Sequence, residues 1–341
     1  WNAMGKTKQR HAETLARAIE KMKLMSDLGK EISAFEKTAS FLDENRPLRY
    51  GVGFDGSRLS EKCFQVCCNM ADQDRGDRIY VLHVETNKDV PAALEAERRQ
   101  KQVQLLADKA GVKITWYKAT QQEDESICTS LMRLVEKVQV DFVILGCYGL
   151  TAEGDQVEMN NFLKEKGTLS QTSDESLRSA DTSVVLVKTT AFKLAESRRF
   201  VLATDNSSAA KSAFALILRM VRDGDIVHVI YASATVKQAS WLGMYEEELG
   251  KLPGVQGKVE VLQVPNGLSV LDTITKFSKE VEADFLVTGI ADYKTGKPLG
   301  SVSMGIARDT RCTTILIKDP HEVTEHRISK SNLEKYLANA A

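Results

Sequence analysis

Short, uninterrupted hydrophobic runs alternate with amphipathic stretches along most of the chain. The runs at 142–145, 184–187 and 285–287 lack the alternation of a half-exposed strand, which is typical of parallel strands covered on both faces. Between such runs, for example at 59–70, apolar residues recur every three or four positions and predict helices that pack on a sheet. Strand and helix alternate five times in each half. The pattern predicts an α/β, doubly wound fold with a parallel sheet and helices on both faces.

The same order of landmarks occurs twice in the chain. Residues 141–146 (Asp-Phe-Val-Ile-Leu-Gly) match residues 284–289 (Asp-Phe-Leu-Val-Thr-Gly) at an offset of 143 (284 − 141). Residues 53–57 (Gly-Phe-Asp-Gly-Ser) likewise pair with residues 203–207 (Ala-Thr-Asp-Asn-Ser). Because the period is about one domain long, we interpret the repeat as a duplicated domain and not as a solenoid, whose repeats run roughly 20 to 50 residues.

The 341 residues suit two domains of roughly 150 residues each. We expect an N-terminal helical extension at 1–47, a first domain at 48–190, a second domain at 198–320 and a polar tail at 321–341. Within the extension, apolar residues recur at three and four positions over 12–42. That helix either packs on the body of the protein or pairs with a partner chain, and the spacing leaves both alternatives open.

The charge balance argues against two classes of partner. Lys and Arg number 46 and Asp and Glu 47, for a net charge of -1, so no overall field attracts nucleic acid or an anionic membrane. No apolar run approaches the roughly 20 residues that cross a bilayer. The six cysteines form no CxxC pair or zinc spacing, and the first 25 residues lack a signal-peptide core. We therefore expect a cytoplasmic protein without a metal site, a nucleic-acid partner or a membrane partner.

Glycines at strand ends and helix starts are the main candidates for chemistry. Gly289 ends a predicted strand, and Gly300-Ser301 opens the next helix, where bare backbone N–H groups suit phosphate. Gly167-Thr168 is the corresponding pair in the first half, although Gly, Ser and Thr also favour helix starts for capping alone. Cys147 is either a packed thiol or an oxidant-sensing thiolate. The chain has no Gly-x4-Gly-Lys-Ser/Thr loop and no nucleophile with a base at a fixed spacing, so we expect no catalytic residues and at most slow ATP hydrolysis.

These motifs, in the same order twice, resemble the universal stress protein family, and specifically a tandem member with two copies in one chain. The resemblance covers roughly residues 48–318. It implies two repeated domains, each with a five-stranded parallel sheet of order 3-2-1-4-5, that pair through their last strands, here 184–187 and 315–317. It also implies an ATP-type site in members that carry Gly-x2-Gly-x9-Gly-Ser/Thr. The candidate nucleotide-binding residues are Asp55, Gly56, Val84, Gly146, Gly149, Gly167 and Thr168 in the first half, and Asp205, Ala232, Gly289, Gly300, Ser301 and Ser303 in the second.

Both halves depart from the family's glycine pattern. In the first, 17 residues separate Gly149 from Gly167 (167 − 149 − 1). In the second, Asp292 replaces the second glycine and lies only seven residues before Gly300 (300 − 292 − 1). Since a carboxylate repels phosphate, the sequence predicts stronger nucleotide binding in the first half.

We expect a stress-response or regulatory module that binds ATP or another adenine nucleotide, with or without Mg²⁺. The alternative is a dimerisation scaffold of the same fold that binds no nucleotide. We also expect the two domains to form separate sheets that pair pseudo-symmetrically within the chain, and a homodimer is a further option for partners.

Overall fold

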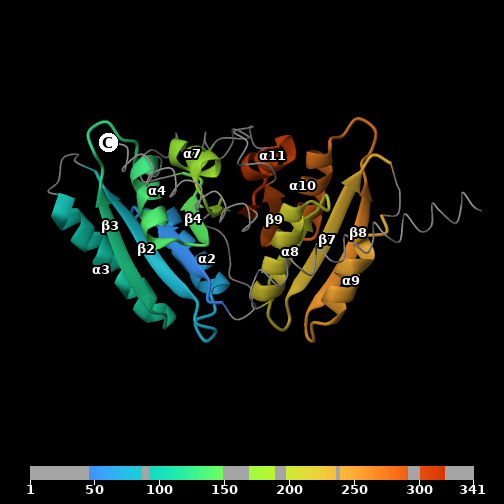
Figure 1. The fold of residues 1–341 in the computed structure, drawn as a ribbon, viewed down its shortest axis with the longest axis horizontal. Coiled ribbons are helices and arrows are strands. Elements are labelled where there is room, and N and C mark those ends of the chain that lie inside the picture. Colours follow the sequence, from blue (N-terminus) through green and yellow to red (C-terminus); the bar gives the residue numbers. More distant parts are fainter. Residues whose placement is uncertain are drawn as a thin grey trace, which may run out of the picture.

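The computed structural model of the chain describes residues 46–86, 92–148, 169–188, 197–235, 239–290 and 300–318, and in these ranges strands and helices alternate (Figure 1). The first half contains β1 (Arg49–Gly53), α2 (Arg58–Met70), β2 (Arg78–Glu85), α3 (Ala92–Ala110), β3 (Ile114–Thr120), α4 (Ile127–Val138), β4 (Phe142–Gly146), α7 (Gln171–Ser179) and β5 (Ser183–Val187). The second half contains β6 (Arg199–Ala203), α8 (Ser208–Met220), β7 (Ile226–Ser233), α9 (Leu242–Gly250), β8 (Gln256–Gln263), α10 (Val270–Glu280), β9 (Phe285–Ile290), α11 (Ser301–Asp309) and β10 (Thr313–Lys318).

The strands of the described ranges join one ten-stranded sheet in the order β3-β2-β1-β4-β5-β10-β9-β6-β7-β8. Neighbouring strands are parallel within each half. The predicted order 3-2-1-4-5 is confirmed in the first half. The second half repeats it from its outer edge inward, as β8-β7-β6-β9-β10.

The expectation of two separate sheets is wrong. Strands β5 and β10 pair antiparallel, with Leu186 opposite Thr314 and Val184 opposite Leu316. Both strands are buried along their whole length. An unpaired edge there would leave backbone N–H and C=O groups without partners in the interior, and the pairing satisfies them. We call this junction, with its flanking helices α2, α7, α8 and α11, the seam.

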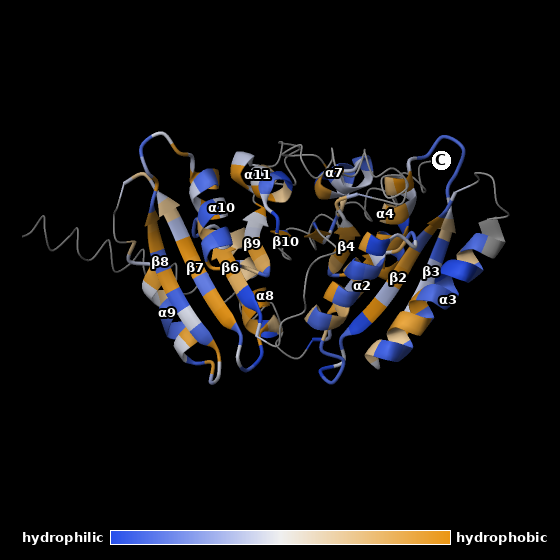
Figure 2. Cartoon of the chain, turned by 180° about the vertical axis from the view of Figure 1, so that it is seen from behind, coloured by the Kyte–Doolittle hydropathy of each residue, from blue (hydrophilic) through white to orange (hydrophobic). Residues whose placement is uncertain are grey.

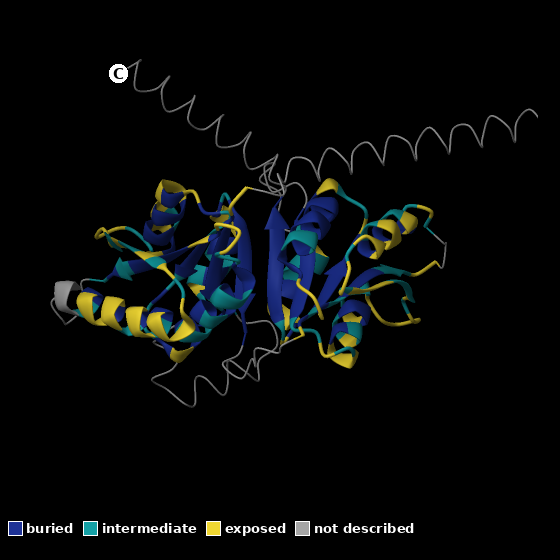
Figure 3. Cartoon of the chain, turned by 90° about the horizontal axis from the view of Figure 1, so that it is seen from below, coloured by how far each residue is buried: buried dark blue, intermediate teal, exposed yellow. Residues whose placement is uncertain are grey.

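Helices cover both faces of the sheet. On one face α2, α3, α8 and α9 share a single apolar cluster that continues across both halves. On the other face α4 and α7 lie over one cluster, and α10 lies over another. Figure 2 shows the hydrophobic strands between polar helix surfaces, and Figure 3 shows the buried residues gathered on the central strands. The cysteines Cys63 and Cys67 lie inside this core, as the helical spacing predicts.

Serine starts many of the helices. Ser57, Ser126, Ser170, Ser207 and Ser269 are the N-caps of α2, α4, α7, α8 and α10, and each side-chain oxygen accepts a hydrogen bond from a backbone N–H of the first turn. These caps fix where each helix begins relative to the strand before it. Helix α9, which follows Trp241, was not predicted, because its sequence has no serine cap and only a weak apolar face.

Several predicted segments lie outside the described residues. They include the helix at 12–42, most of the extension at 1–47, the tail at 321–341, and the site residues Gly149, Gly167 and Thr168. Among the helices that the structure describes, none combines the length and the apolar character needed to span a bilayer.

Candidate functional site

The predicted site residues lie at the carboxyl ends of the strands. In each half the strand order reverses between the first and fourth strands, which are β1 and β4 in one half and β6 and β9 in the other. The helices that follow these two strands leave on opposite faces, so a crevice opens above the strand ends in folds of this type. The carboxyl ends of β1 and β4 in one half, and of β6 and β9 in the other, are therefore one candidate site each.

In the first half the turn after β1 is tightly built. The Asp55 carboxylate accepts a hydrogen bond from the Ser57 N–H at 2.9 Å, and Ser57 caps α2. Gly56 has a φ of +82°, in the region that favours glycine. Asp55 and Gly56 are both partly buried. The predicted pair is therefore held in a fixed turn beside the start of α2.

Arg99 of α3 covers this turn, which the sequence did not predict. A Cβ placed on Gly56 would lie 2.1 Å from Nη1 of Arg99, so the guanidinium rests directly on the glycine. Arg99 is buried and donates to Glu95 at 3.1 Å, while the neighbouring Gln102 donates to Glu61 at 2.6 Å. Helix α3 is charged along its length, so no spacing distinguishes Arg99 from its neighbours. Only the packing of α3 on β2 shows its position.

The end of β4 is tied to the start of α7. The Ser173 hydroxyl donates to the Gly146 carbonyl at 2.8 Å, and the Ser170 N–H donates to the Cys147 carbonyl at 2.7 Å. The α7 N-terminus is capped by its own Ser170. The Ser170 and Ser173 N–H groups, which could donate to a phosphate, are thus already engaged in the first half.

The turn after β6 has the same course with different residues. Asp205 is exposed and its carboxylate accepts from the Ser207 N–H at 3.0 Å, as Asp55 does from Ser57. Asn206 has a φ of +64° where the first half has Gly56. The Thr204 hydroxyl hydrogen-bonds the Tyr245 hydroxyl of α9 at 3.0 Å. Helix α9, through Tyr245, therefore covers this turn as α3 covers the corresponding turn in the first half.

The start of α11 is not covered by any residue that the structure describes. Its N-cap is Gly300, no described side chain caps it, and no described atom lies within 4 Å of a Cβ placed there. Gly300 and Ser301 are exposed, and the Ser303 hydroxyl lies 3.3 Å from the Gly289 carbonyl, to which it donates. Gly289 in turn packs against the backbone of α8 at Ala209 and Ala210. Three predicted residues, Gly289, Gly300 and Ser303, are thereby brought together.

The structure corrects one sequence correspondence. Ser170 and Gly300 are the equivalent N-caps, and Ser173 and Ser303 make the same hydrogen bond to the preceding strand. Gly300 therefore corresponds to Ser170 and not to Gly167. The displacement of three residues is close to one helical turn, which a match of letters does not detect.

Val84 and Ala232 lie next to last in β2 and β7 and are half-buried. Each faces an edge strand, with Val84 opposite Ala119 and Ala232 opposite Leu262. Their place at the strand end is as predicted. Contact with a base through their backbone stays a prediction.

Burial decides the protonation of two groups near the first-half edge. Burial raises the pKa of the Cys147 thiol to about 11, which keeps it protonated and argues against the thiolate alternative. Burial also lowers the pKa of His83, whose Nδ1 lies 2.8 Å from the Phe54 carbonyl oxygen. Within the described ranges, no three His, Cys, Asp or Glu side chains are grouped to hold a metal ion.

The two strand-end glycines should respond differently to alanine. A Cβ on Gly289 would meet backbone atoms of Ala209 and Ala210 at 2.4 to 2.7 Å, whereas one on Gly146 would meet chiefly the flexible Leu59 side chain at 2.7 Å. We expect Gly289→Ala to lower the free energy of unfolding by about 1–3 kcal/mol, and Gly146→Ala to have a smaller effect. Urea unfolding followed by circular dichroism measures both. Equal losses would contradict the packing described for α8.

No protein-family model matches the sequence, and no curated protein does. Among solved structures, a universal stress protein from Archaeoglobus fulgidus DSM 4304 is 18% identical, with a TM-score of 0.61, over 80% of this chain and 98% of that one. A candidate universal stress protein from Pseudomonas aeruginosa UCBPP-PA14 is 15% identical, with a TM-score of 0.55, over 83% of this chain and 97% of that one. A functionally unknown protein from Pseudomonas aeruginosa PAO1 is also 15% identical, with a TM-score of 0.54, over 83% of this chain and 96% of its own. The chain therefore has the fold of universal stress proteins.

Proposed function

We propose that the chain is a tandem universal stress protein that binds an adenine nucleotide at the carboxyl edge of its sheet and acts as a stress-response or regulatory module. The observation that carries the proposal is the N-terminus of α11, which no described side chain caps and where Gly300 and Ser301 are exposed beside the strand-order reversal of the second half. The N–H groups of the first turn and the positive end of the helix dipole favour phosphate there. ATP is the nucleotide that the family resemblance favours.

The geometry of the described residues favours the second half over the first as the stronger nucleotide-binding site. Helix α11 has no acidic residue in its first turn, whereas α7 has Asp174 in its first turn and is capped by Ser170. Arg99 also covers the first-half turn at Gly56. In the second half, Asp205 is exposed where a ribose or base would need an acceptor. We infer that α11 holds the phosphates and Asp205 contacts the nucleoside.

The glycine pattern of the sequence predicts the opposite order of nucleotide affinity, because the first half keeps Gly149 where the second half has Asp292. A carboxylate about 4 Å from a phosphate costs on the order of a few kcal/mol at an effective dielectric near 20. If Asp292 lies that close, the difference exceeds tenfold in affinity unless a cation such as Mg²⁺ intervenes. Mutations in both halves are needed to separate the two rankings.

The test is calorimetric titration of the protein with ATP and with AMP, with and without Mg²⁺. The matched variants are Ser301→Glu and Gln171→Glu, because both residues are exposed first positions of equivalent helices. We expect Ser301→Glu to weaken the tighter binding event at least tenfold and Gln171→Glu to leave it unchanged, since the added carboxylate repels phosphate only where phosphate binds. Asp292→Gly should strengthen the same event.

A different pattern would reverse the ranking. Loss of the tighter event in Gly149→Asp and Gln171→Glu, with Ser301→Glu unaffected, would place the stronger site in the first half, as the glycine spacing predicts. Binding that survives all of these changes would contradict both assignments.

The second candidate function is a scaffold of the same fold that binds no nucleotide. The first half favours this scaffold alternative, because Arg99 covers Gly56 and Ser170 caps α7 at the carboxyl ends of its strands. Absence of binding to ATP and AMP in the unmodified protein and in Asp292→Gly would support this alternative.

A further inference from the structure

Some contacts across the seam are reciprocal, because each half makes the same kind of contact to the other. Strands β5 and β10 pair antiparallel through buried, mostly apolar residues. The buried Lys188 donates to the Ala307 carbonyl in α11, and the buried Lys318 donates to the Ala180 carbonyl at the end of α7. Each half thus gives one strand, one lysine and one helix end. Such contacts would form equally well between two copies of either half.

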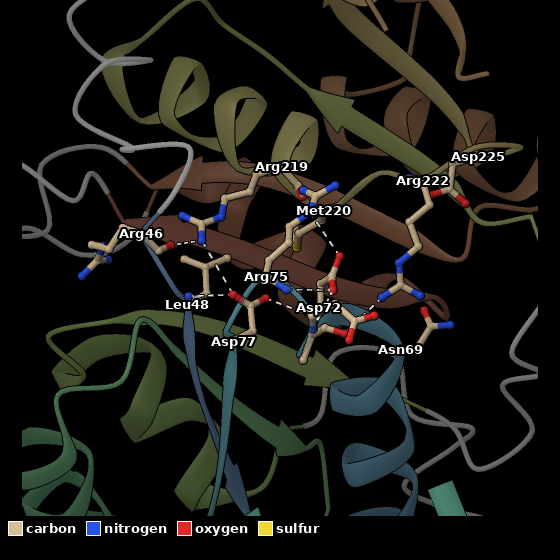
Figure 4. Close-up of polar contacts among 12 residues, drawn as sticks. Arg46, Leu48, Asn69, Asp72, Arg75, Asp77, Arg219, Met220, Arg222 and Asp225 are labelled. Atoms are coloured by element: carbon tan, nitrogen blue, oxygen red, sulfur yellow. Dashed lines mark hydrogen bonds and ion pairs between the residues drawn. The ribbon is translucent and has the colours of Figure 1, made fainter. Parts of the chain in front are cut away.

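A cluster of polar contacts at the ends of α2 and α8 is not reciprocal: the two halves contribute different residues to it (Figure 4). Two arginines of the second half donate to carbonyls at the end of α2: Arg198 to Asn69 at 2.9 Å and Arg222 to Ala71 at 3.0 Å. The last carbonyls of a helix lack partners within the helix, and a cation at that end is stabilised by the helix dipole. In these two contacts the second half supplies the charge and the first half supplies the acceptors.

Two further contacts cross the seam in the same cluster. Arg219 of α8 lies 3.7 Å from the buried Asp77 carboxylate of the first half. Arg75 of the first half donates to the Arg219 carbonyl at 2.9 Å and lies 3.1 Å from Asp72. Figure 4 shows Arg75, Arg219 and Arg222 between the ends of the two helices.

The three arginines of the second half have no basic counterparts in the first. Equivalent positions follow from shared hydrogen bonds: the Arg198 N–H donates to Asp225 as the Leu48 N–H donates to Asp77. The Arg222 and Asp72 N–H groups donate to the same two carboxylates. Arg219 and Asn69 both directly precede the last residue of their helices. The equivalent pairs are thus Arg198 and Leu48, Arg219 and Asn69, and Arg222 and Asp72.

We propose that the seam is a heterotypic interface: it accepts a first half against a second half and rejects two halves of the same kind. The chain then closes on itself, and an exchange of halves between two chains reproduces the same mixed pairing. The partner that fits each seam face is therefore the opposite half, and a homodimer through β5 or β10 alone is excluded.

Charge explains why two halves of the same kind should not pair. Two second halves would bring three arginines from each side to one junction, while the Asp225 carboxylates are already engaged by the Arg198 side chains. Two first halves would leave Asp77 without Arg219, with Leu48 and Asp72 at the positions that supply arginine caps. Discrimination of this kind needs a repulsive element as well as an attractive one, and the cluster has both.

The opposite face of the seam adds to the discrimination. Arg308 of α11 lies 3.1 Å from Asp174 of α7. The residue of α11 that is equivalent to Asp174 is Met304, which offers no carboxylate. Two second halves would therefore place Arg308 opposite Met304, without the carboxylate that it pairs with here.

The experiment uses the full chain with a protease site introduced within residues 189–196. The folded protein is purified, cleaved, unfolded in urea and refolded by dilution, and native mass spectrometry then identifies each pair by the different masses of the halves. We expect mixed pairs almost exclusively. Homotypic pairs at the statistical frequency, half of all pairs, would overturn the proposal.

Variants give the matched control. Replacing Arg198, Arg219 and Arg222 together by the first-half residues Leu, Asn and Asp should lower the share of mixed pairs. Arg199→Leu should not, because Arg199 pairs with Glu282 of its own half. Equal shares of mixed pairs in these two variants would also overturn the proposal.

A second measurement on the uncleaved chain decides the question if the cleaved halves do not refold. Arg222→Asp should lower the folding equilibrium constant about tenfold or more, since it removes a charge-assisted cap and adds a negative charge beside α2. Arg199→Leu should change it by less than about threefold, because its ion pair is exposed. Equal effects would show that the arginines at the seam contribute no more than a surface ion pair.

Discussion

Replacing Asp225 by Ala should lower the free energy of unfolding by about 3–5 kcal/mol, because it strands a buried charge. Asp225 and Arg198 are 1% and 3% exposed, and their closest oxygen and nitrogen lie 2.5 Å apart. Asp225 also accepts from the Arg198 N–H at 2.9 Å and from the Arg222 N–H at 2.8 Å. The substitution removes these acceptors together and leaves the guanidinium without its counter-charge. Urea unfolding at neutral pH measures the loss.

The first half provides the matched control. Asp77 occupies the equivalent position and accepts from the Leu48 and Asp72 N–H groups, but its nearest cation, Arg219, is 3.7 Å away. Asp77→Ala should therefore cost less, about 1–3 kcal/mol, mainly for the unpaired N–H groups.

Adding Arg198→Leu to Asp225→Ala should recover part of the stability, since leucine is the residue that the first half has at this position, Leu48. The double variant no longer contains an unpaired buried charge. If the double variant were less stable than Asp225→Ala alone, the loss would come from packing and the charge argument would be wrong.

Lys318→Met should change how stability depends on pH. Lys318 is 1% exposed, and burial lowers its pKa from 10.5 to about 8, opposed only in part by Asp181. Between these two values the unfolded chain binds the proton and the folded chain does not, so the folded state gains stability as pH rises. Below pH 8 both states are protonated and folding carries the full cost of the buried charge. At about 1.4 kcal/mol per pKa unit, that cost is about 3 kcal/mol.

The quantity to measure is the difference in unfolding free energy between the unmodified protein and Lys318→Met at pH values from 7 to 10.5. We expect the difference to move by about 3 kcal/mol in favour of the unmodified protein as pH rises through this range. Buried cysteines also titrate here, but they are present in both proteins and cancel in the difference. The unpaired Ala180 carbonyl of the variant adds an offset without a pH slope. A flat difference would mean that Lys318 keeps an ordinary pKa in the folded protein.

Lys188→Met is the natural comparison, because Lys188 makes the reciprocal contact across the seam. Burial lowers its pKa as well, while Cys147, Cys312 and Asp309 act to raise it. We expect a slope of the same sign. A slope of opposite sign would show that these neighbouring groups outweigh burial.

The sequence by itself determined most of the elements and the repeat, whereas the strand order came from the family resemblance and helix α9 was missed. Fully apolar runs such as 142–145 can only be strands covered on both faces, and serines such as Ser57 and Ser207 end one element and begin the next. Landmarks that recur in the same order show the duplication. All these signals are local or periodic, so residues close in the chain carry them.

The glycine motifs predicted which residues lie together at the carboxyl ends of the strands, but only in part. Gly289, Gly300 and Ser303 come together as their strand-loop-helix order predicts, because short connections hold neighbouring elements together. The equivalence of Gly300 with Ser170, and the cover that Arg99 forms over Gly56, are visible only in the folded chain. A match of residue letters does not encode helix phase, and the charged helix α3 gives no sign of which arginine turns inward.

Tertiary structure alone decided that the two five-stranded sheets join into one. Nothing in 184–187 or 315–317 shows whether each strand ends its own sheet or continues into the other, since both are apolar and short. The arginine caps connect residues more than a hundred positions apart, such as Arg198 with Asn69 and Arg222 with Ala71. Such contacts depend on two helix ends meeting in space, and their stabilising energy exists only once water has been excluded from the seam.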